Sequence, residues 1–175
     1  MSKGKKRNKK AIIITAFVML LGILMVLTGI FGGSITDLQT GRDYDYLFWD
    51  GDCDVPVGFN NSICVRGSDT AQFLETYLEA AGLTYSEIDD FISFWLPRME
   101  DNPYNLISFP TEEYEEMAEL TVDPAPDTMI RVYMIFMPLD DEIEIPEEQQ
   151  LIMPEPTERE GFVVVEWGGS EAGRM

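Results

Sequence analysis

The sequence predicts a fold of the α+β class, in which one domain outside a membrane follows an N-terminal transmembrane helix. Three observations lead to this expectation. Residues 11–31 form an apolar run, two amphipathic helical patterns follow one another between residues 68 and 96, and most later apolar segments have the pattern of strands. Because strands and helices do not alternate regularly, we expect a mainly antiparallel sheet with a helical hairpin packed on one side.

The transmembrane helix is predicted over residues 11–31, which contain no charge and no proline. As a helix this run would extend about 31 Å, the thickness of the hydrocarbon core of a bilayer. Six basic residues precede the run, and such residues stay on the cytoplasmic side of a spanning helix. We therefore expect a cytoplasmic N-terminus, a cell-membrane location and a C-terminal domain outside. A cleaved signal peptide is the alternative, although its apolar region is usually only about 7–15 residues long.

The distribution of charged residues divides the chain into a basic head and an acidic outer part. All 32 acidic residues lie beyond the predicted helix, where they face six arginines and no lysine. Such a surface repels phosphate backbones, which excludes nucleic acid as a partner of the outer part. The expected organisation is a basic head (1–10), a membrane anchor (11–31), a linker (32–43), an acidic outer domain (44–169) and a tail (170–175).

The outer domain is expected to open with a strand over residues 44–49 and, after a turn-rich loop, a short strand over residues 62–65. A helix follows, which Ser68 or Asp69 can cap and which Gly82 stops. Its apolar residues recur at helical spacing: Phe73, Leu74, Tyr77, Leu78 and Ala81.

The second helix begins at a predicted capping box, because Thr84 and Glu87 have the required spacing. Pro97 is expected to end this helix, since the residue before a proline is driven out of the helical region. We interpret the two helices as a packing unit and not as a DNA reader, because the domain is strongly acidic. The apolar face of the second helix carries Ile88, Phe91, Ile92 and Trp95.

Strand patterns dominate the rest of the chain. A short acidic helix is predicted from Thr111 to about Leu120, with Glu112 and Glu113 near the positive end of its dipole. The proline- and acid-rich segment 146–156 is expected to be a loop. The predicted strands span residues 104–109, 128–137, 143–145 and 161–167.

A series of short motifs runs through the outer part: YLFW from Tyr46, DFI and WLPRM between Asp90 and Met99, NPYNLI from Asn102, PDT and IRV between Pro126 and Val132, and GFVVVEWGG from Gly161. With these motifs, residues 44–169 resemble an uncharacterised domain found near the C-terminal end of exported bacterial proteins, many of them from clostridial relatives. The resemblance implies one outer domain and a bacterial source, and it brings no established activity. The two cysteines are not part of the shared pattern.

Those cysteines, Cys53 and Cys64, flank a turn-rich stretch. Outside the cytoplasm a disulfide is the ordinary outcome for such a pair, and two free thiols are the alternative. The chain has no histidine, which excludes Ser-His-Asp and Cys-His nucleophilic sites and His-ligated metals.

The alternating acids Asp50, Asp52 and Asp54 have the character of Ca²⁺ ligands. An EF-hand loop begun at Asp50 would, however, place Val55 where a glycine is needed and Asn61 where the closing carboxylate is needed. We therefore expect a solvated acidic loop, no metal site and no cofactor.

Glu166 is the candidate buried charge, because it lies inside an apolar strand on the face that carries Phe162 and Val164. We expect it to pair with an arginine, Arg98 first and Arg131 second, since the guanidinium fork suits a buried carboxylate. A carboxyl with a raised pKa that acts in acid–base catalysis is the alternative.

These observations favour a single-pass, outward-facing binding or accessory domain, and no catalytic motif indicates an enzyme. Its expected partner is a cell-envelope component or a protein, and its ligand is undefined. A cation-dependent adhesion or sensing domain is one alternative. A carboxylate-dependent enzyme such as a glycan hydrolase is another, which would need two carboxylates about 5–10 Å apart at a cleft.

Overall fold

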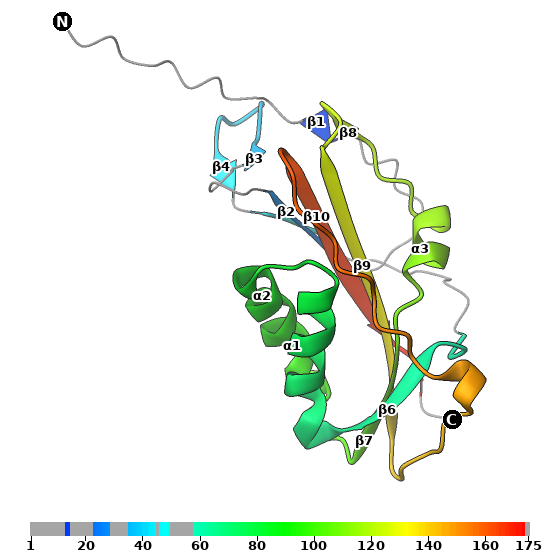
Figure 1. Cartoon of the computed structure of the whole chain (residues 1–175). Coiled ribbons are helices and arrows are strands. Elements are labelled where there is room, and N and C mark those ends of the chain that lie inside the picture. The colour runs from blue at the N-terminus through cyan, green and yellow to red at the C-terminus, as the bar shows by residue number, and fades with distance from the viewer. Residues whose placement is uncertain (1–12, 15–22, 29–34, 45, 50–57, 174–175) are drawn as a thin grey trace, which may run out of the picture.

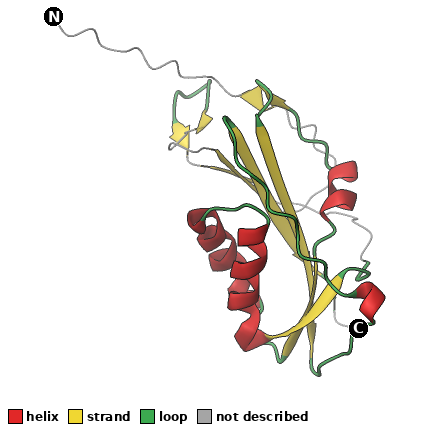
Figure 2. Ribbon diagram, viewed as in Figure 1, coloured by secondary structure: helices red, strands yellow, loops and turns green. Residues whose placement is uncertain are grey.

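The computed structural model describes residues 13–14, 23–28, 35–44, 46–49 and 58–173. These residues form an α+β fold in which a six-stranded mixed sheet carries a pair of helices on one side (Figures 1 and 2). Four of the five strand pairings are antiparallel, as expected, and β10 runs parallel to β9. In spatial order the strands are β5 (Tyr46–Trp49), β2 (Ile23–Thr28), β10 (Val163–Glu171), β9 (Thr128–Leu139), β7 (Tyr104–Ser108) and β6 (Ser62–Arg66).

The long strand β9 has different neighbours along its two halves. On one edge it pairs with β10 from Thr128 to Phe136. On the other edge it pairs with β7 only from Ile135 to Leu139. The first half of β9 therefore has a second edge that no strand covers among the described residues.

The helix pair follows from local sequence signals. A 3-10 turn (Gly67–Asp69) leads into α1 (Thr70–Ala80), and Asp69 makes no side-chain capping bond. After Gly82, whose φ is +93°, the predicted capping box between Thr84 and Glu87 is present and opens α2 (Tyr85–Trp95). The α-helix ends at Trp95, close to Pro97 as predicted, but Leu96 before the proline keeps helical φ and ψ and begins the 3-10 turn Leu96–Arg98.

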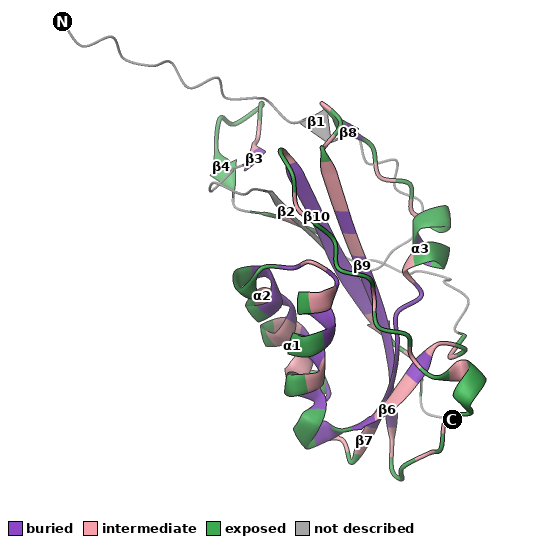
Figure 3. Ribbon diagram, in the orientation of Figure 1, coloured by how far each residue is buried: buried purple, intermediate pink, exposed green. Residues whose placement is uncertain are grey.

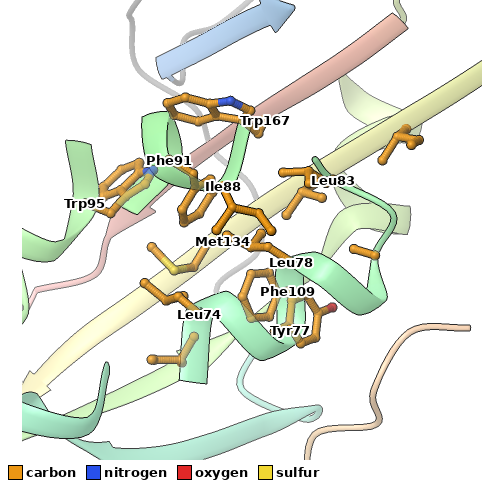
Figure 4. Packing of buried hydrophobic residues seen from close by; sticks show 14 of the residues in the cluster. Leu74, Tyr77, Leu78, Leu83, Ile88, Phe91, Trp95, Phe109, Met134 and Trp167 are labelled. Carbon is orange, nitrogen blue, oxygen red and sulfur yellow. The ribbon is translucent and has the colours of Figure 1, made fainter. Parts of the chain in front are cut away.

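The main core lies between these helices and the central strands, as Figure 4 shows for side chains of α1, α2, β9 and β10. Because side chains alternate along a strand, one face of β10 delivers Val163, Val165 and Trp167 to the helices. Both β9 and β10 are buried along most of their length (Figure 3). Each large apolar side chain buried in this way stabilises the fold by about 1.5–3 kcal/mol.

The opposite face of the sheet is contacted by a short helix, α3 (Thr111–Met117), which ends before the predicted Leu120. Tyr114 of α3 stacks on Tyr133 of β9, with ring centroids 4.3 Å apart. A smaller cluster of apolar residues, including Val122 and Val164, continues on this face.

Two sequence expectations about strands need correction. Residues 143–145 form no strand, and the described segment between β9 and β10 contains a 3-10 turn, Glu147–Gln149, and an isolated bridge between Gln150 and Ser62. The alternating pattern of residues 143–145 was too short to specify a strand without a pairing partner. The last strand is longer than predicted, because β10 continues through Ser170 and Glu171, which were assigned to the tail.

Within residues 11–31, the predicted spanning helix, the structure describes only two short strands. β1 (Ile13–Ile14) pairs with β8 (Val122–Asp123), and β2 lies between β10 and β5. An apolar run rich in branched side chains fits a central strand as well as a helix, so periodicity alone does not separate the two. No helix in the described parts of the chain has the length and apolar character needed to cross a membrane. A two-stranded ribbon of β3 (Ile35–Thr36) and β4 (Asp43–Tyr44) follows within the expected linker.

Candidate functional site

A groove of about 760 Å³ lies beside the first half of β9, where β7 ends and the chain turns into α3. We call it the β9 groove. Met129, Ile130, Arg131 and Val132 of β9 line it directly. Pro110 stands two residues after Ser108, the last residue of β7, so the chain leaves the sheet there and exposes the neighbouring edge of β9.

The far wall of the β9 groove is an extended segment, residues 150–157, which we call the strap. At one end the strap is bonded to the start of β6: the Leu151 N–H donates to the Ser62 carbonyl at 2.8 Å, and the Ile152 N–H donates to Asn61 Oδ1 at 2.7 Å. At the other end Thr157 lies against Gly82, between α1 and α2. The strap thus spans the groove between two fixed points.

The wall of the groove toward the helices is apolar and aromatic. Tyr77 of α1 stacks on Phe109 with ring centroids 3.7 Å apart, and both line the groove together with Ala81. Burial raises the pKa of Tyr77 to about 12, so this phenol is neutral throughout the physiological pH range.

The backbone of β9 presents unpaired polar groups to the groove. The N–H of Thr128 donates toward β10, to the Phe162 carbonyl, whereas the N–H of Tyr133 donates away from β10, to Thr111 Oγ1 at 3.2 Å. Since successive residues direct their backbone groups to opposite edges, Met129 and Arg131 direct theirs into the groove. Among the described residues, these two backbone N–H groups have no hydrogen-bond acceptor.

The charged residues at the groove are almost all acidic. Arg131 is the single cation among the lining residues that the structure describes, and its guanidinium is engaged by Glu166. Four exposed carboxylates line the groove, and we call them the rim acids: Glu112, Glu113 and Glu115 on α3, and Glu155 on the strap.

Glu166 and Arg131 form a buried ion pair behind the groove, between β10 and β9, whose residues 166 and 131 are register partners. The Tyr114 hydroxyl also donates to Glu166 Oε1 at 3.1 Å, and Arg131 Nη2 donates to the Ala118 carbonyl at 2.8 Å. Burial raises the pKa of Glu166, and the Arg131 guanidinium opposes that rise. Burial likewise raises the pKa of Tyr114.

The first choice of partner for Glu166, Arg98, is wrong, and the second choice, Arg131, is the partner that the structure shows. Glu166 points to the face opposite α1 and α2, whereas Arg98 ends the helix pair on the other side of the sheet. Arg98 is exposed, with its guanidinium 4.3 Å from the centroid of the Phe94 ring. Because side chains alternate along β10, Glu166 shares a face with Val164, and this face lies away from the helix pair that carries Arg98.

A second buried ion pair was not predicted from the sequence. Both guanidinium Nη atoms of Arg159 bond the carboxylate of Glu87, at 2.7 and 2.9 Å, and Nη1 also donates to the Gly82 carbonyl at 3.0 Å. Glu87 is therefore shared between the α2 capping box and Arg159, which lies two residues beyond the strap. The only signal in the sequence is that Arg159 is the one basic residue between Arg131 and Arg174.

The remaining predicted site residues lie partly outside the described residues. Cys64, in β6, is half-buried and makes no disulfide with any described residue, while Cys53 and the acids Asp50, Asp52 and Asp54 fall in the undescribed range 50–57. The Cys53–Cys64 disulfide therefore stays a prediction. In the described part of the chain, no group of three or more Cys, Asp or Glu side chains is placed to hold a metal ion.

Comparison of the chain with known protein families, with curated proteins and with solved structures finds no match.

Proposed function

We propose that this chain is a single-pass membrane protein whose outward-facing domain is a binding module, with the β9 groove as its binding surface. The observation that carries the proposal is the open edge of β9, which lies at the bottom of a groove between two anchored walls. Exposed sheet edges of this kind are common recognition surfaces, because their backbone groups can bond a partner.

The membrane anchor of this proposal rests on the sequence: the apolar length of residues 11–31 and the six basic residues before them. Such an anchor is compatible with the bacterial exported protein that the resemblance implies. Because Ile23–Thr28 occupy a sheet position as β2, insertion into a membrane and the pairing of β2 with β10 exclude one another.

Alkaline extraction of membranes separates these two arrangements. The full chain is expected to stay with the bilayer, and protease added to intact cells is expected to digest residues 41–175. Release of the chain by alkaline carbonate would place residues 23–28 in the sheet. Protection of residues 41–175 until lysis would reverse the proposed orientation.

A photo-reactive amino acid placed at Ile152 tests whether the groove is the binding surface. Ile152 lines the groove and is 77% exposed, and Tyr85 on α2, 79% exposed and outside the groove, is the matched control. We expect partner cross-links in native membranes from position 152 and not from position 85. Equal yields of cross-linked partner from the two positions would show that the groove is not the binding surface.

The cross-linking experiment and an added hydrolysis assay address the two alternative functions. Cross-links from position 152 that require Ca²⁺ would favour the cation-dependent adhesion or sensing domain. Hydrolysis of an added glycan, abolished by changing two rim acids to Gln, would favour the hydrolase.

A further inference from the structure

We infer that the β9 groove takes an extended, basic peptide segment of a partner protein, which adds to the open edge of β9 as a further strand. This inference rests on the proposed function and gives the chemical class of its partner. Three independent features of the groove support it: its backbone, its two differently lined faces and its charge.

The backbone supplies the docking edge. Met129 and Arg131 each offer an outward N–H and C=O, enough for a short ladder with one added strand. The ladder stops at Tyr133, because the Tyr133 N–H is already bonded to Thr111 Oγ1. Only a short stretch of an extended peptide can therefore pair, and a helix presents no free backbone groups to such an edge.

The two faces of the groove specify alternating side chains. Ile130 and Val132 point toward α1 and α2, where Tyr77, Ala81 and Phe109 form an apolar wall. Met129 and Arg131 point to the opposite face, on which α3 packs and carries three of the four rim acids. A strand added beside β9 keeps the same alternation, so every second side chain meets the apolar wall and the others meet the carboxylates.

The charge of the groove selects a cationic occupant. The four rim acids are exposed, and the only lining cation among the described residues, Arg131, is bonded to Glu166 on the face of the sheet toward α3. An acidic peptide would meet uncompensated repulsion here. Lysine or arginine at alternate positions would face opposite charge and would also be drawn by the acidity of the whole chain, whose net charge is −20.

The test uses the full chain in detergent micelles and a synthetic heptapeptide of alternating lysine and valine, blocked at both ends. Binding is measured by fluorescence anisotropy. The peptide is compared with two forms that carry N-methyl groups, on all lysines in one form and on all valines in the other. In an added strand only one of these two sets of N–H groups points to β9.

We expect one N-methylated form to lose at least about tenfold in affinity while the other retains it, because each lost backbone bond weakens the ladder. Loss with methylated lysines indicates antiparallel addition, and loss with methylated valines indicates parallel addition. Equal affinity of the two forms would overturn the inference, because adsorption of a polycation does not depend on which amides are methylated. This comparison uses the unaltered protein, so the folding of a variant does not affect it.

A pair of charge-matched variants locates the site. Glu112→Gln, Glu113→Gln and Glu115→Gln together should weaken peptide binding at least about fivefold at low salt. The control combines Glu75→Gln, Glu100→Gln and Glu144→Gln, which change the same charge at exposed positions outside the groove and should leave affinity within about twofold. Equal losses in the two variants would overturn the inference.

Failure of the inference can be distinguished from failure of the proposed function. If no peptide binds but position 152 still gives site-dependent cross-links, the peptide inference is wrong and the groove remains a binding surface for another class of partner. If neither the peptide nor the cross-linker reports binding, both proposals are wrong.

Discussion

Glu166 and Arg131 form a buried ion pair between β10 and β9. Burying either charge without the other would cost on the order of 3–5 kcal/mol of folding free energy. We predict that Arg131→Met lowers the free energy of unfolding by about 3–5 kcal/mol at neutral pH, because it leaves the Glu166 carboxylate buried without its cation. Urea unfolding followed by tryptophan fluorescence measures this change. Arg98→Met, which removes an exposed arginine over an aromatic ring, is the matched control and should cost less than about 1 kcal/mol.

The pH dependence of this variant gives a sharper test. Burial already raises the pKa of Glu166, and removing Arg131 takes away the charge that opposes the rise. A carboxyl with a raised folded-state pKa contributes stability below its ordinary pKa, and this stability is lost as the pH rises through the raised value. The deficit of Arg131→Met should therefore be small near about pH 4.5 and grow toward neutral pH. A deficit that is constant with pH would contradict the assignment, and adding Glu166→Leu should recover part of it.

At the scale of single elements, α2 depends on its capping box. The Thr84 hydroxyl accepts from the Glu87 N–H, and the Glu87 carboxylate accepts from the Thr84 N–H at 2.7 Å. We predict that Thr84→Ala lowers the free energy of unfolding by about 1 kcal/mol, since it removes the side-chain cap of the first turn. Thr76→Ala in the exposed middle of α1 is the control and should change it by less than about 0.5 kcal/mol in either direction. Thermal unfolding of the two variants under one condition compares them.

The segment just beyond the strap is held by the bidentate bonds between Arg159 and Glu87. We predict that Arg159→Met loosens the segment that follows the strap and speeds cleavage after Glu160 by a glutamate-specific protease, because local opening becomes easier. Arg159→Lys should lie between this variant and the unaltered chain, since lysine keeps the charge but not the fork. Mass spectrometry maps the cleavage sites, and Arg66→Met at an exposed arginine of β6 is the control. If the cleavage rate of Arg159→Met is unchanged, other contacts hold this segment in place.

At the scale of the whole molecule, the predicted disulfide would tie the undescribed range 50–57 to β6 through Cys64. We predict that Cys53 and Cys64 are bonded in the exported protein, which in the chain-entropy model stabilises it by about 3 kcal/mol. Alkylation of unreduced, denatured protein followed by mass measurement tests this. Incorporation of two labels would show that both thiols are free.

The sequence predicted those parts of the fold that short-range signals specify. The helix pair was found because Gly82, the capping box at Thr84 and Pro97 mark its boundaries within a few residues of one another. The parallel direction of the pairing between β9 and β10 was missed, because the pairing of distant segments leaves no local pattern.

The candidate site was predictable only in fragments. Glu166 was recognised as a buried charge from its apolar neighbours, and Arg131 was one of its two suggested partners. The β9 groove was not recognised, because it forms where β7 stops beside a strand more than twenty residues later in the chain. Its one local trace is the proline after Phe109, which ends a strand without showing which edge is left open.

The place of β10 in the sheet also constrains the order of assembly. This strand lies third among six in the sheet, yet it is made from residues 163–171 and follows the other five strands in chain order. The core between the helices and β9 includes Val163, Val165 and Trp167, so it cannot form completely until these residues have been synthesised. During synthesis the nascent domain therefore carries an exposed apolar surface until nearly its whole length has emerged. A premature stop just before residue 163 would leave that apolar surface permanently exposed and the chain dependent on chaperones.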